Sequence, residues 1–291
     1  MLCEDVTSVT CSLVQTKAKN SAIDVKQKRK RQENYGELQM NNANQISQQT
    51  QLFGYIGEHA GSSRFSALLN KLFKENQDDF MMLPMNIRRD DFFFTLSNMK
   101  KSHVNGAILS NEYVTQSLDI LDEASALARR SGMCDILFRE GEKLRGDIYS
   151  IRVLLEQLKD FKATKIAIIG TNPHAKALSL LACGFQLSYF SDNLEELNSF
   201  CEEMELHQPD LNRIAPDMQI DLSGFDAVLD FSELANFDMV TKLALTNFDM
   251  KNTQEYSALK SRAVQLGAEY RGYESMIDAL TQQAYRAIKK G

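Results

Sequence analysis

The chain has 291 residues with 33 basic and 39 acidic side chains, and its formal net charge of −6 argues against binding to nucleic acid by counterion release. Hydrophobic residues at 43% and charged residues at 25% are ordinary for a globular protein and exclude collagen-like and globally disordered chains. No apolar run is long enough to cross a bilayer, and the five scattered cysteines lack a CxxC pair, so we expect a cytoplasmic protein without disulfides.

Within residues 1–51, the stretch 16–51 is polar and rich in Lys, Gln and Asn, with a basic run over 26–31. This composition buries too little apolar surface to offset its chain entropy, so it predicts a disordered tail. A nuclear signal or an RNA-binding arm is the alternative interpretation, but no aromatic side chains interleave with the charges. Gly36-Glu37 can be encoded by a ribosome-binding sequence just before Met40, so a start at Met40 rather than Met1 is a further hypothesis.

From Leu52 onward, strand-like and helix-like patterns alternate. Short strands are predicted over 52–56, 80–84 and 106–109, and helices over 66–73, 89–99, 118–130 and 148–158. In the helix over 89–99, we expect Phe92, Phe93 and Leu96 on the buried side.

A second series begins with the apolar strand over 165–170, whose composition is typical of a parallel sheet that is covered on both faces. Helices are then predicted over 175–183, 194–204 and 276–289, and strands over 186–190 and 227–231. This alternation predicts an α/β protein with two α/β domains, the first with a mainly parallel sheet and the second Rossmann-like. We expect the domains at 52–147 and 160–270, a linking helix over 148–159, and a terminal helix over 271–291 that folds back on the first domain.

Several motifs resemble those of the shikimate dehydrogenase family. They are FGYIG at 53–57, Ser63-Arg64 with ALLN at 67–70, LDILDEASALARRSG at 118–132, Leu144-Arg145-Gly146, and IAIIGTNPHAKA at 166–177. The resemblance extends over nearly all of 52–291. It implies an N-terminal substrate domain, a C-terminal nucleotide domain, and reduction of dehydroshikimate by NADPH with a Lys–Asp pair that transfers the proton.

The resemblance places the family's catalytic lysine at Val114 and its aspartate at Ser150, and neither side chain can replace the original group. The substrate-pocket positions fall on Ser63, Phe65, Ser110, Asp135 and Gln283. Asp135 replaces an asparagine and would repel a substrate carboxylate. Gln283 is either the family's substrate-contacting glutamine or an ordinary exposed helix residue.

Two neighbouring residues remain as substitutes for the acid–base pair. Glu112 and Tyr113 carry groups that can transfer protons, and the alternative is that both are ordinary loop residues. The four histidines have no metal-ligand spacing, so we expect no metal site.

The cofactor-pocket positions implied by the resemblance are Gly170, Thr171, Asn172, His174 and Asp192. Dinucleotide turns use glycines so that backbone N–H groups reach the pyrophosphate, but here only Gly170 remains and Pro173 has no N–H. His174 either contacts a phosphate or is a half-exposed residue at a helix start. Asp192 would repel the extra phosphate of NADP, whereas an acid here can accept a ribose hydroxyl of NAD.

The sequence therefore predicts a shikimate dehydrogenase-like protein that lacks the catalytic Lys–Asp pair and the NADP motifs. We expect it to bind an unidentified small molecule or protein partner in the cleft between the domains, with no catalysis and no cofactor. A divergent NAD(P)-dependent oxidoreductase of the shikimate/quinate dehydrogenase type is the alternative. Nothing in the sequence points to a nucleic acid or a membrane as a partner.

Overall fold

The computed structural model describes residues 49–251 and 255–291. The expected tail up to residue 48 and the question of a start at Met1 or Met40 lie outside the described residues. Gln51, which the sequence assigned to the tail, begins the first strand. Among the described residues, no helix is both long enough and apolar enough to span a membrane.

The first sheet has six strands in the order β2-β1-β3-β5-β6-β4. The strands are β1 (Gln51–Gly57), β2 (Phe80–Asn86), β3 (Val104–Leu109), β4 (Glu123–Ala124), β5 (Ile136–Glu140) and β6 (Lys143–Asp147). β1 runs parallel to β2 and β3, and β4 runs parallel to β6, whereas β5 is antiparallel to both of its neighbours. The sheet is therefore mixed, and its parallel pairs outnumber its antiparallel ones.

The helices of this part are α2 (Phe65–Glu75), α3 (Arg89–Met99) and α4 (Ala126–Ser131), with short 3₁₀ turns η1 (Ala60–Ser62), η2 (Asn111–Tyr113) and η3 (Leu118–Ile120). α3 has the predicted bounds, and Phe92 and Leu96 are buried as expected. Phe93 is 46% exposed, so its predicted burial is wrong. The buried stripe of α3 is narrow because only residues spaced by three or four positions share one face.

The single helix predicted over 118–130 is wrong, because the chain forms η3, β4 and α4 there. Asp122 accepts a hydrogen bond from the backbone N–H of Leu144 at 2.8 Å, which holds the chain beside β6. The Ser125 hydroxyl then accepts from the N–H of Ala128 at 3.2 Å and caps α4. Tertiary hydrogen bonds thus override the local helical periodicity.

The second sheet has six parallel strands in the order β14-β13-β11-β7-β8-β9. They are β7 (Lys165–Ile169), β8 (Gln186–Ser191), β9 (Asp210–Arg213), β11 (Ala227–Asp230), β13 (Thr246–Asp249) and β14 (Glu269–Arg271); β10 (Ile220–Asp221) and β12 (Val240–Lys242) form a separate pair. Strand order reverses between β7 and β11, which creates a switch point where such sheets usually bind ligands. The predicted Rossmann-like arrangement is confirmed.

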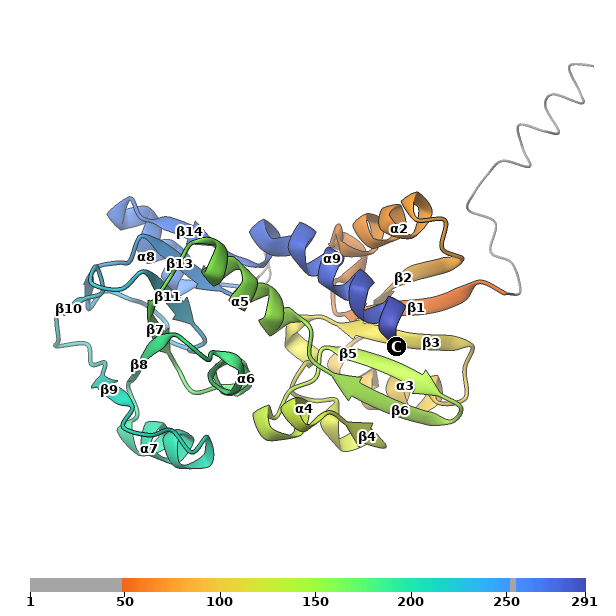
Figure 1. Ribbon diagram of the computed structural model, residues 1–291, viewed down its shortest axis with the longest axis horizontal. Helices are drawn as coiled ribbons and strands as arrows, with labels where there is room; N and C mark the ends of the chain where they lie inside the picture. The colour runs from red at the N-terminus through yellow and green to blue at the C-terminus, as the bar shows by residue number, and fades with distance from the viewer. Residues whose placement is uncertain (1–48, 252–254) are drawn as a thin grey trace, which may run out of the picture. The chain divides into compact units, whose positions relative to one another are not determined.

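The remaining helices are α5 (Ser150–Asp160), α6 (Pro173–Leu181), α7 (Leu194–Glu203), α8 (Ala258–Leu266) and α9 (Tyr273–Lys290). α9 packs against both α2 and α5 (Figure 1). Its contact with the first part includes Tyr285, which donates to Asp78 at 2.8 Å, and Lys289, which lies 2.6 Å from the same carboxylate.

Candidate functional site

A cavity of about 360 Å³ lies at the carboxyl ends of β7, β11 and β13, at the switch point of the second sheet. Its polar lining includes Asn111, Asn172, Asp230, Ser232, Lys251 and Glu255. We call it the switch-point cavity. Its position is the one at which open α/β sheets generally bind small molecules.

A second cavity, of about 560 Å³, lies beyond the ends of β1 and β3. We call it the polar cavity, and its lining includes Tyr55, Ser63, Ser110, Glu112, Tyr273 and Glu274. Glu255 lines both cavities, and Ser110 and Glu112 flank Asn111 of the switch-point cavity. The two cavities therefore adjoin, and together they form the cleft of this protein.

The structure brings three of the predicted pocket residues together around the polar cavity. The Ser63 hydroxyl accepts from the N–H of Phe65 at 3.2 Å, and the Phe65 ring stacks on Tyr55 with centroids 4.7 Å apart. The hydroxyl of Ser110 lines the same cavity and is buried, with no hydrogen-bond partner among the described residues. Such a hydroxyl is a natural contact for a ligand, because burial without a partner is unfavourable.

Tyr55 and Tyr273, which the sequence analysis missed, line this cavity, and Tyr149 lies close to both of them. Burial raises the pKa of all three phenols above the ordinary value. They therefore stay protonated at neutral pH. No spacing signal could have found them, since they come from β1, the start of α5 and the start of α9.

Asp135 and Ser150 also lie together, but they bond to each other. The Asp135 carboxylate accepts from the N–H groups of Tyr149 at 2.8 Å and Ser150 at 3.0 Å, and from the Ser150 hydroxyl. Burial raises the pKa of Asp135 to about 6. These bonds make Asp135 the acceptor for the start of α5, and neither residue lines the two cavities of the cleft.

Three consecutive residues after β3, Glu112, Tyr113 and Val114, have different surroundings, and not all of them line the cleft. Val114 is buried and lines neither cavity of the cleft. Tyr113 donates its hydroxyl to the carbonyl of Ile87 at 2.5 Å, so its hydroxyl is used within the fold. Glu112 accepts from the N–H of Glu58 at 2.9 Å and lines the polar cavity. Of the two predicted substitute acid–base groups, only Glu112 reaches the cleft.

Gln283 lines neither cavity of the cleft. It lines a different cavity, of about 640 Å³, together with Arg145 and Arg286, and its side-chain oxygen accepts from Arg286 at 3.4 Å. The structure therefore does not bring Gln283 to Ser63 or Ser110.

The loop after β7 is built differently from a phosphate-binding turn. The Asn172 side chain accepts from the N–H groups of His174 at 3.0 Å and Ala175 at 3.2 Å, and Pro173 has no N–H. Thr171 donates its hydroxyl to Glu196. The backbone donors in the first turn of α6 are therefore used or missing, so this end of the helix does not fit a pyrophosphate.

His174 is buried, which corrects the expectation of a half-exposed residue. Burial lowers its pKa to about 4, so the ring is neutral at pH 7 and offers no charge to a phosphate. Gly170 has φ of +94°, and a Cβ there would lie 2.8 Å from the backbone of Phe231. The close approach of β7 and β11 thus explains this glycine. Asp192 is exposed directly after β8, where an acid can accept ribose hydroxyls.

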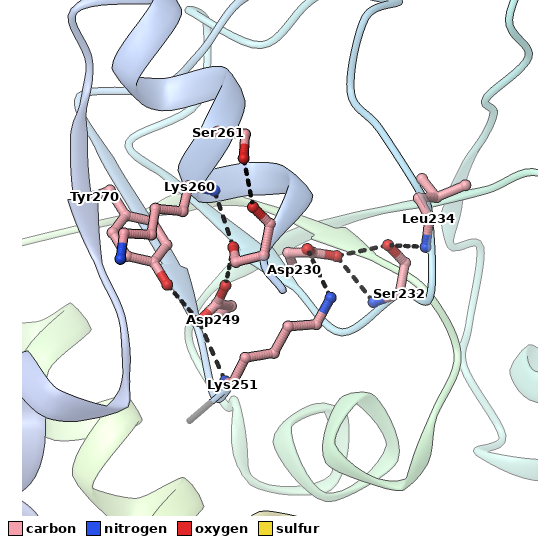
Figure 2. Close-up of polar contacts among 9 residues, drawn as sticks. Asp230, Ser232, Leu234, Asp249, Lys251, Lys260, Ser261 and Tyr270 are labelled. Carbon is pink, nitrogen blue, oxygen red and sulfur yellow. Dashed lines mark hydrogen bonds and ion pairs between the residues drawn. The ribbon is translucent and has the colours of Figure 1, made fainter. Parts of the chain in front are cut away.

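Figure 2 shows a buried acidic cluster at the ends of β11 and β13 that the sequence analysis missed. Asp230 accepts from the N–H and the hydroxyl of Ser232 at 2.9 and 2.6 Å through one oxygen. Its other oxygen lies 3.9 Å from the ammonium of Lys251 and has no hydrogen-bond partner among the described residues. Asp249 accepts from Tyr270 at 2.9 Å. An aspartate that ends an apolar strand, as in AVLD and TNFD, is a signal that could have revealed both.

Asp230 should make the protein less stable as the pH rises. Burial raises its pKa from 3.8 to about 6, so the native state holds this proton more tightly than the unfolded state between those values. The free energy of unfolding should therefore fall as the pH rises from about 4 to about 6. In urea titrations at pH 4.5 and 7.5, Asp230→Asn should reduce this fall by about 1–3 kcal/mol. An equal fall in both proteins would contradict the assignment.

Comparisons with known proteins agree with this fold. No family model matches the sequence. The shikimate dehydrogenase (NADP(+)) of Halothermothrix orenii is 27% identical over 134 residues, 44% of this chain and 46% of the relative. That of Dictyoglomus thermophilum is 25% identical over 152 residues, 50% of this chain and 55% of the relative. The chain thus matches about half the length of these curated relatives.

Two solved structures extend the comparison. The shikimate 5-dehydrogenase of Thermus thermophilus, in complex with NADP(H) and shikimate, has a TM-score of 0.61 at 13% identity, covering 81% of this chain and 94% of the other. An Ael1 enzyme from Pseudomonas putida has a TM-score of 0.68 at 11% identity, covering 83% and 94%. At these identities the likeness shows the fold alone.

Proposed function

We propose that this chain, a distant relative of the shikimate dehydrogenases, binds a small polyhydroxylated molecule in its cleft. The main support is the buried hydroxyl of Ser110, which lines the polar cavity and has no hydrogen-bond partner among the described residues. Tyr55, Ser63 and Tyr273 add three hydroxyls around the same space. Hydroxyls both donate and accept, so such a lining matches the hydroxyls of a polyol.

The charges around the polar cavity favour a neutral ligand over a carboxylate. Arg64 lies 2.6 Å from Glu274, and Arg89 lies 3.3 Å from Glu58. Both arginines are therefore already paired with acids, and Glu112 adds a further carboxylate to the lining. A ligand carboxylate would meet this excess of negative charge.

The residues at the family's catalytic and cofactor positions support ligand binding without dehydrogenation. Val114 is apolar and buried, and Ser150 is hydrogen-bonded to Asp135 away from the cleft. The first turn of α6 lacks spare donors for a pyrophosphate. This protein is therefore a binding relative for which we propose no cofactor.

A divergent NAD-linked oxidoreductase of the shikimate/quinate dehydrogenase type is a second candidate. Asp192 favours it, because an exposed acid after β8 suits the ribose of NAD and opposes the extra phosphate of NADP. The structural relative from Thermus thermophilus binds NADP(H) and shikimate. Glu112 is the group in the cleft that would then take up or release a proton.

Thermal denaturation with myo-inositol, shikimate and quinate tests the proposal. At a hundredfold excess over its Kd, a bound ligand stabilises the native state by about 2.7 kcal/mol, which raises the Tm of a chain of this size by about 5–10 °C. We expect inositol to stabilise the protein more than shikimate does. Ser110→Ala should reduce the affinity for inositol at least tenfold, whereas Ser199→Ala on the exposed face of α7 should not change it.

Absorbance at 340 nm separates the two candidates. With NAD or NADP present, the proposal expects no oxidation of shikimate, quinate or inositol. Steady reduction of NAD in this assay would overturn the proposed binding function in favour of the oxidoreductase. If none of the three polyols stabilises the protein at millimolar concentration, polyol binding in the polar cavity is wrong.

A further inference from the structure

We infer that the switch-point cavity binds a nucleoside without a phosphate group, whose ribose hydroxyls donate to Asp230. The inference rests on the proposed function in that this cavity is one half of the same cleft. It goes further by naming a ligand class for a cavity that the polyol does not fill. Four observations carry it.

The first observation is the unsatisfied oxygen of Asp230. Asp230 lines the cavity, its side chain is buried, and one carboxylate oxygen has no hydrogen-bond partner among the described residues. The Lys251 ammonium is 3.9 Å from this oxygen, beyond hydrogen-bond distance (Figure 2). A ligand hydroxyl can supply the missing donor, since a carboxylate only accepts.

The second observation is the charge of the lining. Among the described residues of the lining, Asp230, Glu233 and Glu255 contribute three carboxylates and Lys251 one ammonium, and His174 is neutral at pH 7. A phosphate in this cavity would meet net negative charge at short range. A neutral nucleoside meets no such repulsion.

The third observation concerns the backbone N–H groups at the N-terminus of α6. In a dinucleotide-binding fold the first turn of this helix offers backbone N–H groups to the pyrophosphate. Here the side chain of Asn172 accepts from two of them, those of His174 and Ala175, and Pro173 has none. The part of the crevice that would hold phosphates is therefore occupied by the protein's own side chain.

The fourth observation is the aromatic wall. Tyr256 lines the cavity and is 64% exposed, so much of its aromatic surface is accessible to a ligand. Phe231 and Met250 add apolar surface to the same lining. An open aromatic face beside an unsatisfied carboxylate matches a base joined to a ribose better than a plain polyol, because bases stack on such rings.

Isothermal titration of the full chain at pH 7.5 with adenosine, AMP and NAD tests the inference. We expect adenosine to bind at least tenfold more tightly than AMP or NAD. Asp230→Asn should weaken adenosine binding at least tenfold, and the control Asp221→Asn, which changes an exposed aspartate paired with Lys242, should leave it unchanged. Asn172→Ala should reduce the preference for adenosine over AMP, because it releases the N–H groups of α6.

A second variant keeps the test decisive if Asp230→Asn does not fold. Tyr256→Ala, at an exposed side chain, should also weaken adenosine binding at least tenfold. AMP or NAD binding as tight as adenosine overturns the inference, and so does the absence of adenosine binding at 10 mM. Inositol binding that depends on Ser110 would then leave the proposed function standing. Adenosine binding without inositol binding would reject the proposed function instead.

Discussion

Replacing Asp135 with alanine should lower the free energy of unfolding by about 3–4 kcal/mol. The change leaves two buried backbone N–H groups, those of Tyr149 and Ser150, and the Ser150 hydroxyl without their acceptor. The start of α5 would then hold unsatisfied donors in a place that water does not reach. For a chain of this size the expected fall in Tm is about 6–15 °C.

Denaturant titration with circular dichroism measures this loss. Asp119→Ala on η3 is the matched control, because Asp119 is exposed, and it should change the stability by less than about 0.5 kcal/mol. A fall in the free energy of unfolding of less than about 1 kcal/mol for Asp135→Ala would mean that the carboxylate does not stabilise the start of α5.

Gly170→Ala should destabilise the protein by about 3–4 kcal/mol, and Gly184→Ala by only about 1–2 kcal/mol. The two glycines have nearly equal positive φ angles, +94° and +92°, so alanine is strained at both positions. A Cβ at Gly184 meets no atom within 4 Å, whereas one at Gly170 lies 2.8 Å from the backbone of Phe231 and Ser232. The difference between the variants therefore measures the close approach of β7 and β11.

Urea midpoints of the two variants give this difference directly. If both lose the same stability, the approach of the two strands does not require the glycine. A clear difference would account for Gly170 without a dinucleotide. The glycine would then be no argument for a cofactor.

The sequence was a good guide where apolar composition decides the structure. β7 has the apolar composition expected of a strand that is covered on both faces, and the bounds of β7 and β8 were each predicted to within one residue. The hairpin of β5 and β6 was missed, because a short apolar run such as Ile136–Phe138 does not distinguish a strand from a helix segment. The error over 118–130 came from hydrogen bonds to residues far along the chain, which periodicity does not report.

The candidate site was predicted in part. The resemblance led to Ser63 and Ser110, because their loops follow β1 and β3 and keep recognisable motifs. It did not show that Asp135 bonds to Ser150, since a residue-by-residue match compares positions singly and not in pairs. The cluster around Asp230 depends on the adjacency of β11 and β13, which only the order of strands reveals.

The packing of α9 on α2 has a consequence for synthesis on the ribosome. Tyr285, which packs near Phe73 of α2, bonds to Asp78, 207 residues earlier in the chain. At 5–20 residues per second, α2 therefore waits about 10–40 s after it is made before its covering helix is translated. During that interval the part of α2 that α9 covers is open to chaperones and to other nascent chains, although its side toward β1 and β2 can already pack. A chain that ends within α8 would thus have every strand of its N-terminal sheet but no α9 to cover α2. The uncovered apolar surface of α2 favours aggregation.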